Sequence, residues 1–297
     1  MTKRPLSRRS FLKIVGASAA ASSFGTFGTF LYAREVEPSW VDVNPIMLKL
    51  PRLPAAFDGY RVVHITDLHV DDTWMNRERL TEIVRLVNAQ KPDLVAITGD
   101  FITAHPDRFA ADTIAALRLL EAPDGVFGVL GNHDHWSNAT ISRQILRESG
   151  VRELNNSTFS LTRQQQQLHL VGLDDLWPIP DQLVALESFR PRLAHLAATL
   201  PAGGAAILLA HEPDIADVSA AVGRFDLQLS GHSHGGQVRV PGHGTLIVPF
   251  LAHKYPDGRY QVGSMIQYTG RGLGMAFPQV RFNCRPEITV FSLTGDA

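Results

Sequence analysis

Five short polar motifs stand out along the chain because their residue types are those that bind metal ions. They are Asp67-Leu68-His69, Gly99-Asp100, Gly131-Asn132-His133-Asp134, His211 and Gly231-His232-Ser233-His234. Together they offer several imidazoles, two carboxylates and one amide, a donor set without sulfur that favours Mn, Fe, Zn or Co over Ca or Mg. Seven such donors are too many for one ion. They fit two ions that share one carboxylate, the arrangement that clamps the oxygens of a phosphoryl group during its displacement.

Each motif taken singly has an ordinary structural explanation. Asp-x-His after a strand is often a cap beside a surface histidine, Gly-Asp is a common turn, and His211 could simply precede a helix. The spacing argues otherwise, since 33 residues separate Asp67 from Asp100 and 32 separate Asp100 from Asn132, about one βαβ crossover each. Successive parallel strands would deliver these side chains to the C-terminal edge of one sheet, where ligands bind in open α/β folds.

The elements that must position these motifs alternate between strands and helices over the first two-thirds of the chain. Strands are expected at 61–66, 93–98, 125–130, 168–173, 205–209 and 226–229, and helices at 76–90, 110–121, 139–148 and 213–221. In the last third the expected elements are strands alone, at 237–240, 246–248, 260–268 and 287–291. We also expect an edge strand before residue 58 and a hairpin tip at 164–167. The pattern predicts an α/β fold whose last third is mainly β.

The N-terminus has the pattern of an export signal. The first 13 residues carry five positive charges and no acid, so the rest of the chain has a net charge of −6 against −1 for the whole. Residues 14–33 are uncharged, and the segment Ser7–Lys13 resembles the twin-arginine export motif. We therefore expect residues 1–33 to be a twin-arginine signal or a membrane anchor, 34–58 a lead-in segment, and 59–297 one folded domain. Cleavage of the signal stays open, because twenty uncharged residues can also span a bilayer.

Composition excludes several classes of protein. The chain has 297 residues, of which 44% are hydrophobic and 19% charged, as in globular proteins. Its one cysteine, Cys284, excludes an intramolecular disulfide and a thiolate zinc site. The negative net charge argues against nucleic acid as a partner.

The five motifs, in this order, resemble those of the calcineurin-like metallophosphoesterases over roughly residues 60–235. The resemblance implies a four-layer αββα sandwich, with two mixed β-sheets flanked by helices. The export signal, residues 171–175 and residues 230–240 further resemble a branch of exported or membrane-associated phosphodiesterases that includes UDP-diacylglucosamine pyrophosphatases. One position departs from the pattern. Many members have an aspartate three residues after the Gly-Asp aspartate, where this chain has Thr103, so we expect altered surroundings of the metal ligands rather than a lost ligand.

The resemblance also implies a role for each motif residue. One metal ion would be held by Asp67, His69 and His234, and the other by Asn132, His211 and His232. Asp100 would bridge the two ions, which would generate the attacking hydroxide. His133 would bind no metal and would protonate the leaving oxygen or stabilise the transition state, with Asp134 orienting and charging it.

Other polar residues carry weaker expectations. We expect His64 to be a core histidine. Surface or helix positions are expected for His105, His169 and His195, and a place in the pocket wall is considered for His135, Trp136, Asp174, Asp175 and Trp177. Lys254 and Arg271 are considered as partners of a second phosphate, although a purely structural turn explains Arg271 equally well.

The reaction predicted from these observations is hydrolysis of a phosphodiester or pyrophosphate bond at the cell envelope, the periplasm or the outer face of the cytoplasmic membrane. The substrate would be a phosphorylated small molecule, a lipid-linked one or a nucleotide-sugar similar to UDP-diacylglucosamine. Apolar loop residues that suit acyl or sugar groups are Leu176, Trp177, Ile179, Phe250, Leu251 and Tyr255. A phosphomonoesterase with the same metals is the main alternative, and a non-catalytic metal-binding scaffold is the second. The twin-arginine export machinery is the expected protein partner.

Overall fold

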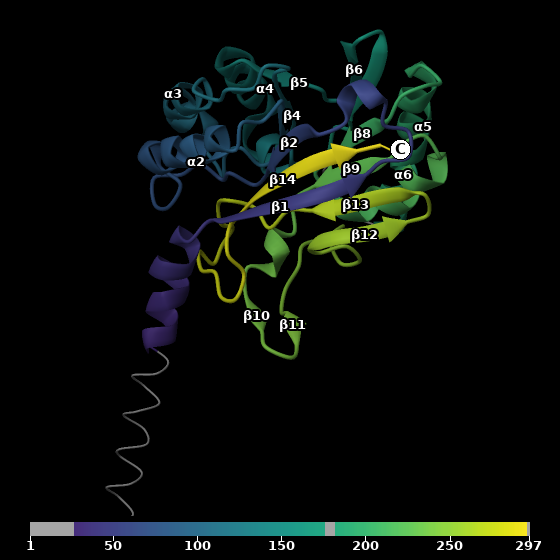
Figure 1. Cartoon of the computed structure of the whole chain (residues 1–297). Coiled ribbons are helices and arrows are strands. Elements are labelled where there is room, and N and C mark those ends of the chain that lie inside the picture. The colour runs from purple at the N-terminus through teal and green to yellow at the C-terminus, as the bar shows by residue number, and fades with distance from the viewer. Residues whose placement is uncertain (1–26, 176–181, 296–297) are drawn as a thin grey trace, which may run out of the picture.

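Two six-stranded sheets form the centre of the molecule. A computed structural model describes residues 27–175 and 182–295 (Figure 1). The first sheet has the strand order β1-β14-β2-β3-β4-β5 and the second β12-β13-β9-β8-β7-β6. The strands of the first sheet are β1 (Asp42–Lys49), β2 (Tyr60–Ile65), β3 (Leu94–Thr98), β4 (Val126–Val129), β5 (Val151–Glu153) and β14 (Glu287–Thr294). Those of the second are β6 (Ser157–Arg163), β7 (Gln166–Gly172), β8 (Ala206–Leu209), β9 (Leu227–Ser230), β12 (Gly258–Val262) and β13 (Met265–Thr269).

Helices cover the outer face of each sheet. The helices on the first sheet are α2 (Arg77–Ala89), α3 (Pro106–Leu117) and α4 (Asn132–Ser149), and those on the second are α5 (Gln182–Thr199) and α6 (Ala216–Val222). Figure 1 shows the two helical groups on opposite sides of the molecule. A small hairpin of β10 (Arg239–Val240) and β11 (Gly244–Thr245) projects from the body. The predicted four-layer αββα sandwich is confirmed.

Alternation along the strands explains the layers. In β3, Leu94 and Ala96 pack into the core between the sheets, whereas Val95 and Ile97 pack under the helices of the first sheet. Successive side chains of a strand point to opposite faces, so a strand that is covered on both faces is apolar throughout. The same alternation divides β8 between the central core and the α5–α6 layer.

Strand direction brings the five motifs to one place. Strands β2, β3 and β4 are parallel neighbours in the first sheet, and β8 and β9 are parallel neighbours in the second. Each of these five strands is followed directly by one motif. The first three motif loops therefore emerge at the C-terminal edge of the first sheet, as the crossover spacing predicts, and the last two emerge at the C-terminal ends of β8 and β9 in the second sheet.

Several expected elements need correction. The strand expected at 260–268 is a hairpin of β12 and β13, because Gly263 adopts a positive φ of 57° and reverses the chain. The strand expected at 246–248 is absent from these described residues, and β11 lies just before it. Helix α4 begins seven residues before the expected 139 and is interrupted at Asn138. Helix α5 was not expected at all, whereas the edge strand in the lead-in and the hairpin tip near 164 are confirmed.

The histidines outside the motifs fall mainly where expected. His64 is buried in β2 and its Nε2 lies 2.8 Å from the Thr98 hydroxyl, while His105 and His195 are exposed. The surface or helix position expected for His169 is wrong, because this residue is buried in β7, inside the second sheet. Its two ring nitrogens are satisfied there by the hydroxyl of Ser160 and the carbonyl of Gly203.

The N-terminal helical segment, residues 27–39, docks against the loop before β14. The ring of Tyr32 meets that of Phe282 edge to face, with centroids 6.4 Å apart, and the carbonyl of Ala33 accepts a 2.7 Å hydrogen bond from the Arg281 amide. The Glu37 carboxylate accepts a 2.8 Å hydrogen bond from the Asn283 amide. Within the described residues, no helix is both long and apolar enough to cross a membrane. Residues 1–26, which hold most of the expected signal, lie outside the described residues.

Candidate metal centre

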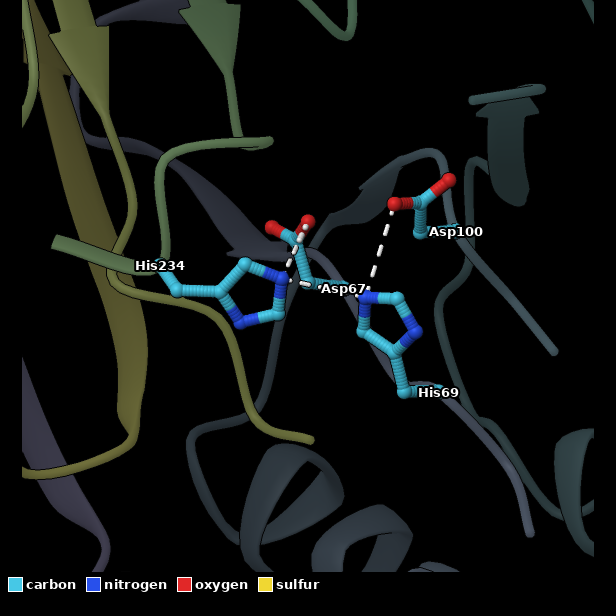
Figure 2. Close-up of side chains that lie close together, drawn as sticks. All are labelled: Asp67, His69, Asp100 and His234. Carbon is cyan, nitrogen blue, oxygen red and sulfur yellow. Dashed lines mark hydrogen bonds and ion pairs between the residues drawn. The ribbon is translucent and has the colours of Figure 1, made fainter. Parts of the chain in front are cut away.

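A first group of donor atoms comes from the Asp67 motif, Asp100 and His234 (Figure 2). Its four ligand atoms, one each from Asp67, His69, Asp100 and His234, all lie within 4.8 Å of one another, and all four residues are buried. The Nε2 atoms of His69 and His234 face each other at 3.0 Å. His69 Nε2 is 3.4 Å from Asp100 Oδ2, and His234 Nε2 is 3.4 Å from Asp67 Oδ1.

A second group shares Asp100 with the first. It consists of Asp100, His211 and His232. His211 Nε2 lies 3.3 Å from Asp100 Oδ2, 3.2 Å from His232 Nδ1 and 3.1 Å from Asn132 Oδ1. A single oxygen, Asp100 Oδ2, thus lies next to donor nitrogens of both groups, which is the position of a bridging ligand.

The opposite nitrogens of these rings are held by other groups. His211 Nδ1 lies 2.7 Å from the Thr98 carbonyl, and His232 Nε2 lies 2.7 Å from the Phe250 carbonyl. A carbonyl only accepts, so these nitrogens carry the proton and leave the other nitrogen of each ring with a lone pair for a metal. Thr103 Oγ1 is 3.4 Å from His69 Nδ1. The residue that departs from the family pattern therefore lies beside a candidate ligand, at its outer side.

The backbone of the ligands is strained. Five of the seven candidate ligands have left-handed φ angles between 47° and 68°, namely Asp67, His69, Asp100, His232 and His234. Such a conformation costs a non-glycine residue on the order of 1 kcal/mol, and it persists only where the surrounding structure enforces it. Clusters of such residues are typical of functional sites.

A glycine-rich loop encloses the first donor group. An added Cβ at Gly272 would lie 2.9 Å from the Cβ of Asp67, and one at Gly274 would overlap the carbonyl of Leu68. The buried Arg281 holds this loop by donating to the carbonyls of Gly272, at 3.0 Å, and Gly274, at 2.7 Å. The glycines thus let the backbone approach the ligands closely.

The electrostatics of the cluster favour a bound cation. Burial raises the pKa of Asp67 to about 7 and lowers the pKa values of His69 to about 3 and of His232 to about 4, so these imidazoles are neutral, as ligands must be. Burial alone would lower the pKa of His211, but the carboxylates of Asp100 and Asp67 raise it well above its ordinary value. Positive charge is therefore drawn to the space between the carboxylates. This donor set fits divalent metal ions.

His133 belongs to neither donor group. It is half-buried at the start of α4, its ring centroid 4.7 Å from that of His69, and its Nδ1 lies 3.0 Å from the Thr103 carbonyl. Its backbone amide donates to Asp100 Oδ1 at 2.9 Å.

The orienting role expected for Asp134 is corrected by the structure. Its carboxylate accepts hydrogen bonds from the backbone amides of Gly131, at 3.0 Å, and Phe101, at 3.1 Å. Asp134 is the third residue of α4 and turns back to cap that helix. It braces the loops after β3 and β4, and the Thr103 carbonyl is the group that contacts the His133 ring.

A cavity of about 450 Å³ opens beside the donor atoms. Asp100, Asn132, His133, His232 and His234 line one wall. A second part of the lining, which we call the apolar wall, includes Val238, Leu246, Ile247, Phe250, Leu251, Phe277 and Pro278. Trp136, Asp175, Phe250 and Leu251 lie in the wall as expected. Leu176, Trp177 and Ile179 lie outside the described residues.

Other residues considered for the pocket have partners elsewhere. His135 turns away from the cavity to Asp174, with Nε2 2.8 Å from Oδ1. Lys254 pairs with Asp217 at 2.7 Å, and the Tyr255 hydroxyl donates to the same carboxylate. Arg271 pairs with Asp42 at 2.7 Å and with Glu287 at 2.9 Å, which supports the structural explanation.

Sequence reasoning missed two parts of the cavity wall. Glu212 is buried and lines the cavity, and burial together with the Asp175 carboxylate raises its pKa well above the ordinary value. Its place directly after His211 was the available signal. Leu246, Ile247 and Phe277 come from loops without periodicity, and only the lack of charge around them could have drawn attention.

Residues 60–236 match the family model of the calcineurin-like phosphoesterases. The chain belongs to this family. It is therefore a metal-dependent phosphoester hydrolase, and the resemblance expected over roughly residues 60–235 is confirmed.

Similar proteins span nearly the whole chain. Uncharacterized metallophosphoesterase YkuE of Bacillus subtilis is 35% identical, with 98% of each chain covered. Phosphodiesterase YaeI of Escherichia coli is 31% identical over 97% of this chain and 99% of its own. UDP-2,3-diacylglucosamine pyrophosphatase LpxG of Chlamydia trachomatis is 26% identical over 88% of this chain and 91% of its own.

Proposed function

We propose that this phosphoesterase is binuclear and hydrolyses a phosphodiester or pyrophosphate bond. The observation that carries the proposal is the position of Asp100 Oδ2, which lies 3.4 Å from His69 Nε2 in one donor group and 3.3 Å from His211 Nε2 in the other. The ligands of one ion would be Asp67, His69 and His234, and those of the other Asn132, His211 and His232, with Asp100 between them.

The chain's own residues supply the remaining chemistry. Two divalent ions, when bound, would polarise phosphoryl oxygens and lower the pKa of the attacking water. His133 lines the cavity, and its Nδ1 lies at the Thr103 carbonyl, so Nε2 is the atom that can pass a proton to the leaving oxygen.

The proposed substrate is a membrane or envelope phosphodiester or pyrophosphate, with an acyl or lipid-linked part. The cavity has the size of a small-molecule site, and its lining combines the metal donors with an apolar wall. The relatives whose names carry phosphodiesterase and pyrophosphatase activities support this class of bond.

Two measurements on the full chain in detergent test the proposal. The first is metal content after reconstitution with Mn or Zn, for which we expect about two ions per chain. A stoichiometry of one or less would exclude the binuclear proposal. The second is kcat/KM on a lipid-linked pyrophosphate, a bare diester and p-nitrophenyl phosphate with one metal. A preference for the monoester would instead favour a phosphomonoesterase.

The proposed location is the cell envelope, reached by the twin-arginine route. The paired arginines of the Ser7–Lys13 segment and the uncharged run at 14–33 support it. Replacing both arginines by lysine (Arg8→Lys with Arg9→Lys) keeps the charge, so we expect the protein to fold but to stay in the cytoplasm. Cell fractionation measures where the double variant accumulates, and its normal export would exclude the twin-arginine route.

A further inference from the structure

The mouth of the cavity is ringed by exposed apolar side chains, which we name the apolar rim: Trp136, Leu246, Ile247 and Phe277. Their exposed fractions are 49%, 55%, 79% and 95%, and all four also line the cavity. Large apolar side chains that are this exposed and gather at one opening indicate a surface that binds a membrane, a protein or a ligand.

A second set of exposed apolar residues lies on the N-terminal helical segment. Phe27, Phe30 and Leu31 are 61%, 48% and 41% exposed. Their spacing of three and four residues places them on one face of the helix. This face is continuous in sequence with the uncharged run that begins at residue 14.

Contacts connect the helix to the rim. Tyr32 packs on Phe282, whose carbonyl accepts a 2.9 Å hydrogen bond from the amide of Arg239 in β10. Val238, which precedes β10, forms a β-bridge with Phe282 and lines the same cavity as the rim. Figure 1 shows the N-terminal helix and the β10–β11 hairpin projecting from the same end of the molecule.

Three of the four rim residues, Leu246, Ile247 and Phe277, come from a segment that is poor in acids. From Leu227 to Pro286 the only acidic residue is Asp257, although acids make up 29 of the 297 residues of the chain. The Asp257 carboxylate is paired with Arg239 at 2.6 Å. The same segment has six lysines and arginines, of which Arg239, Lys254, Arg271 and Arg285 pair with carboxylates and Arg281 is buried, so exposed charge of either sign is sparse on it.

We propose that the apolar rim and the exposed face of the N-terminal helix together form a docking surface for a phospholipid bilayer. The cavity mouth then opens toward the acyl region, and a lipid-linked substrate enters from the plane of the membrane. The bilayer is favoured over a protein partner because the rim adjoins a helix that continues the uncharged N-terminal run, and because the segment that supplies Leu246, Ile247 and Phe277 has a single acid. The route of entry rests on the proposed lipid-linked substrate, whereas the docking itself does not.

The first experiment measures whether single positions of the full chain enter the bilayer. An environment-sensitive dye is attached to Phe277→Cys and, as the control, to Leu119→Cys. The natural Cys284 is only 1% exposed, so labelling is selective. Leu119 suits the control because it is 50% exposed and lies at the other end of α2 from the N-terminal segment. Its carbonyl accepts a hydrogen bond from Asn88, near the end of α2, whereas Arg79, at the start of α2, contacts Pro38 of the N-terminal segment. The two ends are about 13 Å apart along the helix.

We expect vesicles of phosphatidylcholine with phosphatidylglycerol to shift the emission at position 277 to the blue and to leave position 119 unchanged. Emission typical of water at position 277 on vesicle-bound protein would overturn the proposal, whatever holds the chain there. Equal shifts at both positions would also overturn it, because they indicate adsorption without orientation.

The second experiment measures partitioning by flotation. Ile247→Ser with Phe277→Ser should weaken binding to the same vesicles by about tenfold or more, and Leu119→Ser should leave it unchanged. Metal content of both variants checks that the fold is intact. Unaltered partitioning of the double variant would count against the rim. Failure of either experiment would leave the metal stoichiometry and bond class standing, so the two proposals fail separately.

Discussion

The two walls of the cavity are built in opposite ways. On the donor wall, Asp100 is buried and its Oδ1 accepts a hydrogen bond from the His133 amide. Behind it, Asp67 and His211 are buried and are each held by a hydrogen bond to backbone. On the apolar wall, Ile247 and Phe277 are 79% and 95% exposed.

This difference in burial indicates that the donor wall binds metal and the apolar wall contacts acyl chains. A metal centre needs donor atoms held closely in place, because binding and charge stabilisation both depend on preorganised geometry. A surface that meets acyl chains needs only apolar area, which is non-directional. Substitutions on the donor wall should therefore change rates and metal content steeply, whereas those on the apolar wall should change binding gradually.

The largest effect is expected from Asp100→Asn. Removing the shared negative charge should lower metal content at both sites and reduce kcat by more than about 10³-fold. Metal analysis and steady-state kinetics on one preparation measure both. Loss of only one ion would show that Asp100 serves a single site, and the two donor groups would then be independent.

His133→Ala should act on rate alone. A general acid contributes about 10²–10⁴-fold, so kcat should fall by that factor while metal content stays at the wild-type value. If metal were lost in proportion to activity, His133 would be a ligand and its proposed role would be wrong.

Gly272→Ala tests how closely the donor wall is enclosed. Gly272 has a φ of 70° and faces the Cβ of Asp67, whereas Gly263 has a φ of 57° and open space around it. Gly263→Ala is thus a matched control for backbone strain, which costs about 1 kcal/mol.

We expect Gly272→Ala to weaken metal binding by about tenfold beyond any change in the control, measured by competition with a chelator. Equal metal affinity in the two variants would mean that the loop does not support Asp67.

The smallest effect is expected at His135, which lies near the cavity but turns away from it. The hydrogen bond to Asp174 raises the pKa of His135, although burial opposes the shift. Its stabilising contribution should be complete below about pH 6.5 and be lost as pH rises through the raised pKa.

The Tm of His135→Gln should therefore lie a few degrees at most below that of the wild type at mildly acidic pH, and the difference should shrink at higher pH. The exposed His195→Gln serves as control. A difference that grows with pH would contradict the assignment.

The meeting of the metal donors could be predicted from the sequence because it follows from the direction and order of the strands. Asp67, Asp100 and Asn132 follow parallel strands at crossover spacing, so their meeting point is implied by the order of elements.

The apolar wall had no such signal. Phe277 and Ile247 belong to irregular loops, and nothing periodic indicates which of their side chains remain exposed. Local geometry was likewise beyond reach at Asp134, whose carboxylate turns back to the first turn of its own helix, and at His169, whose burial depends on partners from Ser160 and Gly203.

The placement of β14 has a consequence for how the protein is made. This strand lies between β1 and β2, pairing Asp42 with Glu287 and His64 with Thr289. The sheet that carries the first three motifs therefore closes only when a segment more than 220 residues downstream has left the ribosome. Chains truncated before β14 therefore cannot complete the sheet. On the proposed twin-arginine route, which carries proteins that are already folded, this strand has to be in place before transport.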